Sequence, residues 1–232
     1  MDESLTKKKA VGWVFATVLA PLLIAYVLSV PCISFWYYQT GHQGQPPGDV
    51  IMRVFMDVAA PALWATIALW WLIHRKTSSF AELFATRTGS FVRDLPIGLG
   101  LGALWVVIYG LWVVPFGEMF VIDLAKLRSI PASLSAGFCE EFLFRGFVFL
   151  VIARAGGGWK SQVVYSSLAF GAAHLTWGPW GMAWTVVLGF TFGAARLWCG
   201  NVWPAVVAHT LLDLCIEPGL IEKAATMSRS FG

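Results

Sequence analysis

The sequence contains little charge: only 12% of its 232 residues are Asp, Glu, Lys or Arg. A typical soluble domain carries about 25%, so this chain has too few charged side chains to cover a water-facing surface of its size. The formal net charge is only +3, and it comes from scattered positions rather than from a basic stripe. The composition therefore disfavours a soluble enzyme, a disordered protein and a nucleic-acid-binding protein.

Cysteine is also scarce, and the sequence has no CxxC pair. Each cysteine stands singly inside or at the edge of an apolar run, so neither a disulfide framework nor a zinc ribbon is indicated. We interpret these residues as small buried hydrophobic side chains. They are Cys32, Cys139, Cys199 and Cys215.

The chain is rich in apolar side chains: 58% of it is hydrophobic, 15% is aromatic and the mean hydropathy is +0.70. A helix needs about 20 apolar residues to cross a bilayer core of roughly 30 Å. The sequence therefore predicts an all-α protein, a polytopic transmembrane bundle of about seven spans that forms one membrane domain over residues 1–232. We expect the two shortest spans, the fifth and the seventh, to pack inside the bundle. The predicted spans are 11–36, 52–74, 95–115, 131–154, 161–176, 180–198 and 202–216.

Two connecting stretches mix apolar and charged residues, namely Ser78 to Arg93 and Phe116 to Ile130. This mixture predicts interfacial amphipathic segments. Three glycines, Gly98, Gly100 and Gly102, fall at the start of the third predicted span. No predicted strand precedes them, so we interpret them as sites of close helix packing rather than as a dinucleotide-binding loop.

The predicted loops are alternately rich and poor in Lys and Arg. Lys7, Lys8 and Lys9 precede the first span, whereas the loop from Gln39 to Asp49 contains no Lys or Arg. By the positive-inside rule this pattern predicts an amino terminus inside and a carboxyl terminus outside. The other loops rich in positive charge carry Arg75, Lys76, Arg87 and Arg93, and then Arg154 and Lys160.

Ionisable side chains gather inside the fourth, fifth and seventh predicted spans. Placing such a group at the centre of a membrane costs roughly 2.5–3.5 kcal/mol on insertion scales, so its presence there indicates a function. The group comprises Glu140, Glu141, Arg145, His174, His209 and Asp213.

The spacing of these residues predicts which of them meet. Glu141 and Arg145 are four residues apart, so they share one helix face and should form an ion pair. Glu140 points elsewhere, has no local cation, and is free to meet other helices as a general base. His209 and Asp213 are also four apart, which would let the carboxylate hold the histidine in one tautomer.

Three short motifs on these spans resemble those of a known family. Glu140 to Arg145 matches the EExxxR signature of the CPBP family, the CAAX proteases and bacteriocin-processing enzymes that are also called Abi. Phe170 to His174 matches its FxxxH motif, and His209 to Asp213 matches its HxxxN or HxxxD motif. The motifs occur in the family's order, and the resemblance covers a CPBP-like catalytic region over residues 95–216.

This resemblance implies an intramembrane endopeptidase of glutamic type, similar to the type II CAAX prenyl endopeptidases. Glu140 with His174 would activate a water molecule, His209 would stabilise the oxyanion, and Glu141 with Arg145 would brace the site. Asparagine often occupies the last motif position, and an ionised Asp213 cannot donate a hydrogen bond. We therefore interpret Asp213 as a residue that orients His209.

The same resemblance implies the setting of the reaction. We expect no cofactor, a bacterial cytoplasmic (inner) membrane as the location, and the lipid bilayer as a partner. The expected substrate is a peptide or protein with a membrane-associated tail, and no nucleic acid is expected to bind. From Pro131, Glu140 lies roughly 13 Å below the predicted outer face at 1.5 Å per residue, which favours an opening toward that face. The resemblance to prenyl-tail endopeptidases, whose substrates are cytosolic, favours the opposite face.

Several alternatives stay open. Glu141, Arg145 and Asp213 could be purely structural, and Phe170 is interpreted as packing. The chain could be a catalytically silent family member that binds a peptide, as an immunity protein would. It could also use zinc held by Glu140, His174 and His209, although no HExxH pair is present. A proton-coupled transporter would predict inverted repeats, which the sequence does not show.

Overall fold

The computed structural model describes residues 7–40, 59–74, 84, 91–113, 118–120, 130–216 and 221–223. Helices dominate these residues, and two short irregular helices connect pairs of them: the π-helix η4 (Phe142–Val148) and the 3₁₀-helix η5 (Leu175–Trp177). The α-helices are α1 (Lys7–Thr40), α3 (Ala60–His74), α5 (Phe91–Val113), α6 (Ile130–Glu141), α7 (Phe149–Arg154), α8 (Trp159–Ala173), α9 (Gly178–Cys199) and α10 (Trp203–Ile216).

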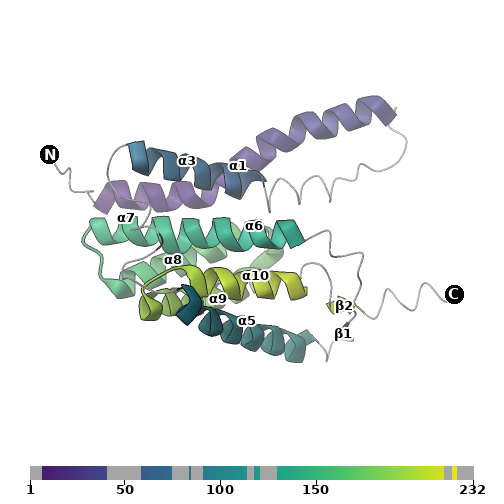
Figure 1. Ribbon diagram of the computed structural model, residues 1–232. Coiled ribbons are helices and arrows are strands. Elements are labelled where there is room, and N and C mark those ends of the chain that lie inside the picture. The colour runs from purple at the N-terminus through teal and green to yellow at the C-terminus, as the bar shows by residue number, and fades with distance from the viewer. Residues whose placement is uncertain are drawn as a thin grey trace.

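The helices form a bundle with the carboxyl-terminal helices at its centre. Helices α1 and α3 lie along one side and α5 along the opposite side, with α6 to α10 between them (Figure 1). Helix α10 packs against α5, α6 and α9, and α8 packs mainly against α9 and α1. The buried core therefore lies where α6, η4, α8, α9 and α10 meet.

The helical class predicted from the sequence is confirmed, since helices make up the described residues apart from short connections and two three-residue strands. Three helical stretches are long and apolar enough to cross a membrane, namely Lys7–Pro31, Phe91–Leu111 and Gly178–Cys199. Two shorter apolar helices, Ala60–Trp70 and Trp203–Cys215, accompany them. These helices indicate a membrane protein, while the count of about seven spans stays a prediction.

The fourth predicted span is not one regular helix. Over 131–154 the chain runs through α6, η4 and α7, so a π-helix of seven residues interrupts the expected α-helix. The fifth predicted span also ends earlier than expected, because α8 stops at Ala173 and His174 caps it.

The two predicted interfacial segments lie mostly outside the described residues. In the first segment, Phe84 is buried, and residues 91–93 belong to α5. In the second, Glu118–Phe120 form strand β1, which pairs antiparallel with β2 (Ile221–Lys223). These three residues are thus extended and not part of an amphipathic helix, since pairing with β2 supplies partners for their backbone groups.

Glycines allow two helices to approach α10 closely. A Cβ atom at Gly98 would lie 2.8 Å from Cβ of Val207, and one at Gly102 would lie 3.0 Å from the carbonyl oxygen of Ala208. Gly100 has no such neighbour within 4 Å, so the predicted packing role is confirmed for two of the three glycines. In α6, a Cβ at Gly137 would collide with the side chain of Thr210, so α6 and α10 meet one turn before Glu140 and Glu141.

A buried polar cluster that the sequence analysis missed joins α5 to the turn between α9 and α10. The carboxylate of Asp94 is 1% exposed and accepts hydrogen bonds from Arg93 Nε at 2.7 Å and from Asn201 Nδ2 at 2.5 Å. The Oδ1 atom of Asn201 accepts from the backbone N–H of Trp203 at 3.0 Å. Arg196 on α9 is also buried. Its position as a charged residue inside the predicted span 180–198 is a sequence signal for a buried polar contact.

The interpretation of the cysteines as buried side chains is confirmed for two of them. Cys139 and Cys199 are free and buried, whereas Cys215 is free and only partly buried. The side chain of Cys32 lies outside the described residues.

Candidate active site

The two adjacent glutamates end α6, and the π-helix η4 follows them directly. Every residue of η4 is buried, including Arg145. Short π-helical segments inside α-helices are frequent at functional sites. Here the segment places Arg145 in the centre of the bundle, one helical turn beyond Glu141.

Glu141 and Arg145 form the predicted ion pair. Arg145 Nη1 donates to Glu141 Oε1 at 2.9 Å, and both side chains are 0% exposed. The Nε and Nη2 atoms of Arg145 have no hydrogen-bond partner among the described residues. Its guanidinium carbon lies 4.3 Å from the ring centre of Phe170, 5.5 Å from that of Phe192 and 6.0 Å from that of Phe144. These ring faces offset part of the cost of burying the cation.

His174 caps the carboxyl end of α8 and points toward α6. Its Nδ1 atom lies 2.8 Å from the carbonyl oxygen of Phe170, one turn earlier in the same helix. Because that contact uses Nδ1, the Nε2 atom is left to face Glu140, and it lies 3.8 Å from Glu140 Oε2. The ring of Trp177 packs edge-on against the imidazole with 4.8 Å between ring centres.

His209 lies on α10, and both of its ring nitrogens have polar neighbours. Its Nδ1 atom lies 2.9 Å from Glu141 Oε1. Its Nε2 atom is 3.4 Å from Asp213 Oδ2 and 4.0 Å from Glu140 Oε2. Glu141 therefore orients the Nδ1 side of His209, whereas Asp213 faces the same nitrogen as Glu140 does.

Glu140 is the group on which both imidazoles converge. Its Oε2 atom is buried and has no hydrogen-bond partner among the described residues. The separations of 3.8 and 4.0 Å from the two Nε2 atoms are too long for direct hydrogen bonds. Polar atoms at such distances can share a bridging water molecule.

The structure brings all the predicted site residues together. Glu140 and Glu141 come from α6, Arg145 from η4, His174 from the end of α8, and His209 and Asp213 from α10. No group of three or more His, Cys, Asp and Glu side chains in the described residues is arranged to hold a metal ion.

Two phenylalanines also contact the site. Phe170 packs edge-on against both imidazoles, with ring centres 4.8 Å from His174 and 5.7 Å from His209. Phe192 of α9 stacks on His209 at 5.6 Å. Phe170 belongs to the FxxxH motif and was interpreted only as packing. Phe192 was missed, because a phenylalanine in an apolar span carries no distinguishing signal in the sequence.

The fold and the site together define a class of protein: a helical membrane protein with acid–base groups at the centre of its bundle. Residues 123–215 match the family model described as "Type II CAAX prenyl endopeptidase Rce1-like". This region contains all the predicted site residues, and the match confirms the resemblance to the CAAX protease family. The family indicates a CAAX-type intramembrane protease and implies peptidase activity. Neither a curated protein nor a solved structure was found to match the chain.

Proposed function

We propose that the chain is an intramembrane endopeptidase of glutamic type that hydrolyses a peptide bond in a membrane-associated tail. The observation that carries the proposal is the position of Glu140. Its buried Oε2 atom has no hydrogen-bond partner among the described residues and lies 3.8 and 4.0 Å from the Nε2 atoms of His174 and His209. A carboxylate oxygen that faces two imidazoles inside an apolar bundle without a direct hydrogen bond to either suits a group that binds and deprotonates a water molecule.

In the proposed reaction, Glu140 accepts one proton from the water molecule, while the remaining O–H group donates a hydrogen bond to His174 Nε2. The hydroxide attacks the carbonyl carbon of the scissile peptide bond, and the carbonyl oxygen becomes an oxyanion. His209, with a proton on Nε2, donates a hydrogen bond to that oxyanion. When the carbon–nitrogen bond breaks, Glu140 returns its proton to the leaving amine, and an acid and an amine are released.

Glu141 and Arg145 act on this reaction through His209. Glu141 Oε1 accepts from both Arg145 Nη1 and His209 Nδ1, each at 2.9 Å. A proton on Nδ1 that is bound to a carboxylate orients the imidazole and stabilises its charged form. Asp213, 3.4 Å from Nε2, lies on the side where the oxyanion would form.

The surroundings of the site favour electrostatic stabilisation. The rings of Phe170 and Phe192 are at most 1% exposed, and both contact His209 and Arg145. Hydrogen bonds and charges are stronger where apolar side chains exclude water. Trp177, which is 53% exposed, marks the more accessible edge of the site beside His174.

The test is Glu140→Gln in the purified full-length protein. The probe is an internally quenched peptide that ends in a farnesylated cysteine and three further residues, compared with the same peptide without the lipid. We expect the wild type to cleave a probe and Glu140→Gln to lose at least about 100-fold in kcat, the usual minimum for a general base. Glu118→Gln makes the same substitution in β1, outside the three motifs and the matched residues 123–215, and should cleave at the wild-type rate.

Unchanged turnover in Glu140→Gln would remove that residue as the base. If the wild type binds the probes without cleaving them, and Glu140→Gln binds equally well, the chain is a silent family member.

A further inference from the structure

We propose that Phe192 of α9 is a positioning residue that sets the plane of the His209 imidazole and the place of the Arg145 guanidinium. Only the expected effect on turnover rests on the proposed function; the positioning of His209 can be tested without a substrate. None of the three sequence motifs includes any part of α9, and Phe192 brings a side chain of this helix to the site.

The first observation is the contact between Phe192 and His209. The two rings are stacked, with 5.6 Å between their centres and an angle of 28° between their planes. Phe192 is 0% exposed. Phe170 meets the same imidazole edge-on, at 5.7 Å and 83°. The imidazole therefore has one ring nearly parallel to it and another nearly perpendicular.

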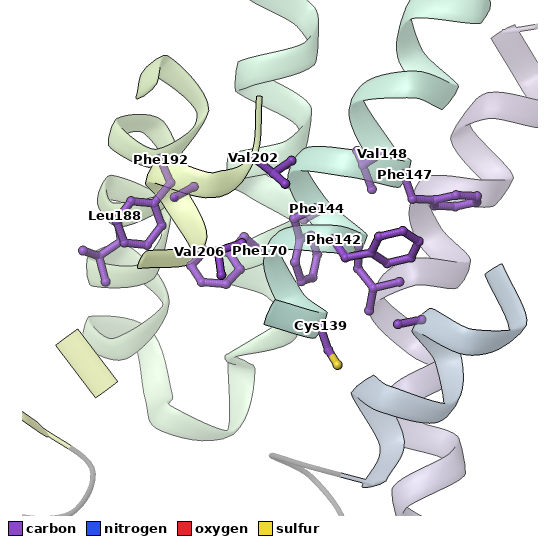
Figure 2. Close-up of a cluster of buried hydrophobic side chains, with 14 of the residues drawn as sticks. Cys139, Phe142, Phe144, Phe147, Val148, Phe170, Leu188, Phe192, Val202 and Val206 are labelled. Atoms are coloured by element: carbon purple, nitrogen blue, oxygen red, sulfur yellow. The ribbon is translucent and has the colours of Figure 1, made fainter. Parts of the chain in front are cut away.

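The second observation is that the same ring contacts Arg145. The guanidinium carbon of Arg145 lies 5.5 Å from the ring centre of Phe192. Arg145 and His209 both donate to Glu141 Oε1. Phe192 thus packs against both donors of one buried carboxylate, and Figure 2 shows its ring in the same core cluster as Phe144 and Phe170.

The hydrogen bond to Glu141 orients the Nδ1 edge of His209 but does not alone fix the plane of the ring. It fixes the position of Nδ1 but leaves the ring able to tilt about that contact. Such a tilt moves Nε2, which must face both Glu140 Oε2 and the developing oxyanion. A flat ring packed against the imidazole removes this freedom, whereas a flexible aliphatic side chain of similar size does not. Misplacing a reacting group by about 1 Å can cost roughly 100-fold in rate.

The chain offers a matched control for a purely structural effect. Phe149 is also a buried phenylalanine, 3% exposed, and its ring centre lies 5.5 Å from the guanidinium carbon of another buried arginine, Arg196. Like Phe192, Phe149 is buried and has an arginine over its ring, but that arginine, Arg196, is not part of the site. Phe149→Leu should therefore reproduce the packing loss of Phe192→Leu without disturbing His209.

The kinetic experiment compares the wild type, Phe192→Leu, Phe192→Tyr, Phe149→Leu and Glu140→Gln on the same quenched peptide. We expect Phe192→Leu to lose about 100-fold in kcat with KM unchanged, since the loss affects the transition state and not substrate binding. Phe192→Tyr, which keeps a flat ring, should recover most of the turnover. Phe149→Leu should keep the wild-type kcat. Equal kcat values for the two leucine variants would overturn the proposal.

A second measurement needs no substrate. In protein labelled with ¹⁵N-histidine, the side-chain NMR signals of His209 are assigned by their loss in His209→Gln. We expect one set of signals in the wild type, in Phe192→Tyr and in Phe149→Leu, and broadened or split signals in Phe192→Leu. Unchanged His209 signals in Phe192→Leu, or the same broadening in Phe149→Leu, would overturn the positioning role.

The two measurements separate the two proposals. If the wild type cleaves no probe, or if Glu140→Gln cleaves at the wild-type rate, the proposed function fails while the NMR result still decides the role of Phe192. If Glu140→Gln is inactive and Phe192→Leu behaves like Phe149→Leu in both measurements, only the positioning role fails.

Discussion

His209 Nδ1 lies 2.9 Å from Glu141 Oε1, and this contact joins α10 to the end of α6 across 68 positions of the sequence. The same oxygen accepts from Arg145 Nη1. The first and third motifs are therefore physically connected through the second of the two adjacent glutamates. The first glutamate, Glu140, is left to face the two Nε2 atoms.

Glu141→Gln should destabilise the protein, unlike Glu140→Gln. The substitution removes the carboxylate that pairs with the fully buried Arg145, and breaking a buried ion pair costs on the order of 3–5 kcal/mol. Thermal unfolding in detergent should show a clear drop in Tm for Glu141→Gln, and turnover should fall as well. Glu140→Gln should keep the wild-type Tm. Equal Tm values for the two variants would contradict the bracing role of Glu141.

Asp213→Asn should retain most of the turnover, whereas Asp213→Ala should lose it. Asparagine keeps a polar group beside His209 Nε2 that can still accept from the imidazole, whereas alanine leaves that nitrogen without this neighbour. Loss of the group that orients His209 should lower kcat, since misplacing a reacting group by about 1 Å can cost roughly 100-fold. The measurement is kcat for both variants on the quenched peptide. If kcat falls as far in Asp213→Asn as in Asp213→Ala, the negative charge of Asp213 is required. A carboxylate, and not merely a polar group, would then orient His209.

Activity should survive prolonged treatment with a zinc chelator. In the proposed reaction Glu140 and His174 activate the water, so no metal ion is needed to do so. Turnover is measured before and after chelation and dialysis, with a known zinc protease treated in parallel. Loss of turnover that only added zinc restores would assign Glu140, His174 and His209 to a metal site instead.

The direction of the chain across the membrane can be tested with single introduced cysteines. The loop charges predict that Gln39→Cys, near the end of α1, reacts with a membrane-impermeant thiol reagent applied outside the cell. Ser78→Cys, in the loop rich in positive charge, should not react, and the parent chain provides the background. Labelling of Ser78→Cys alone would reverse the topology and place the opening of the site on the cytoplasmic side.

The helices and the local ion pair could be predicted because both depend on short-range spacing. Apolar runs of sufficient length form helices wherever they are placed in a bilayer. Glu141 and Arg145 meet because residues four positions apart share one helix face. The ionisable groups inside apolar spans were a second signal, since their cost is hard to explain without a function.

The irregular backbone was not predictable in the same way. Nothing in the residues 142–148 distinguishes a π-helix from an α-helix, because the choice depends on what packs around the segment. One such contact is the hydroxyl of Ser166 on α8, which donates to the carbonyl oxygen of Phe144 at 2.8 Å. The extended pair β1 and β2 likewise joins segments that are far apart in the sequence.

The sequence alone indicated which residues belong to the candidate site, because ionisable side chains stand out inside apolar runs and residues four positions apart share a helix face. The tertiary structure decided which atoms meet. Glu141, and not Asp213, binds Nδ1 of His209, because α6 and α10 approach closely where Gly137 faces Thr210. The role of α9 was equally a matter of packing, since the stacking of Phe192 on His209 depends on the rotation and depth of two helices. Those quantities are set by how whole helix surfaces fit together, and no local pattern of residues encodes them.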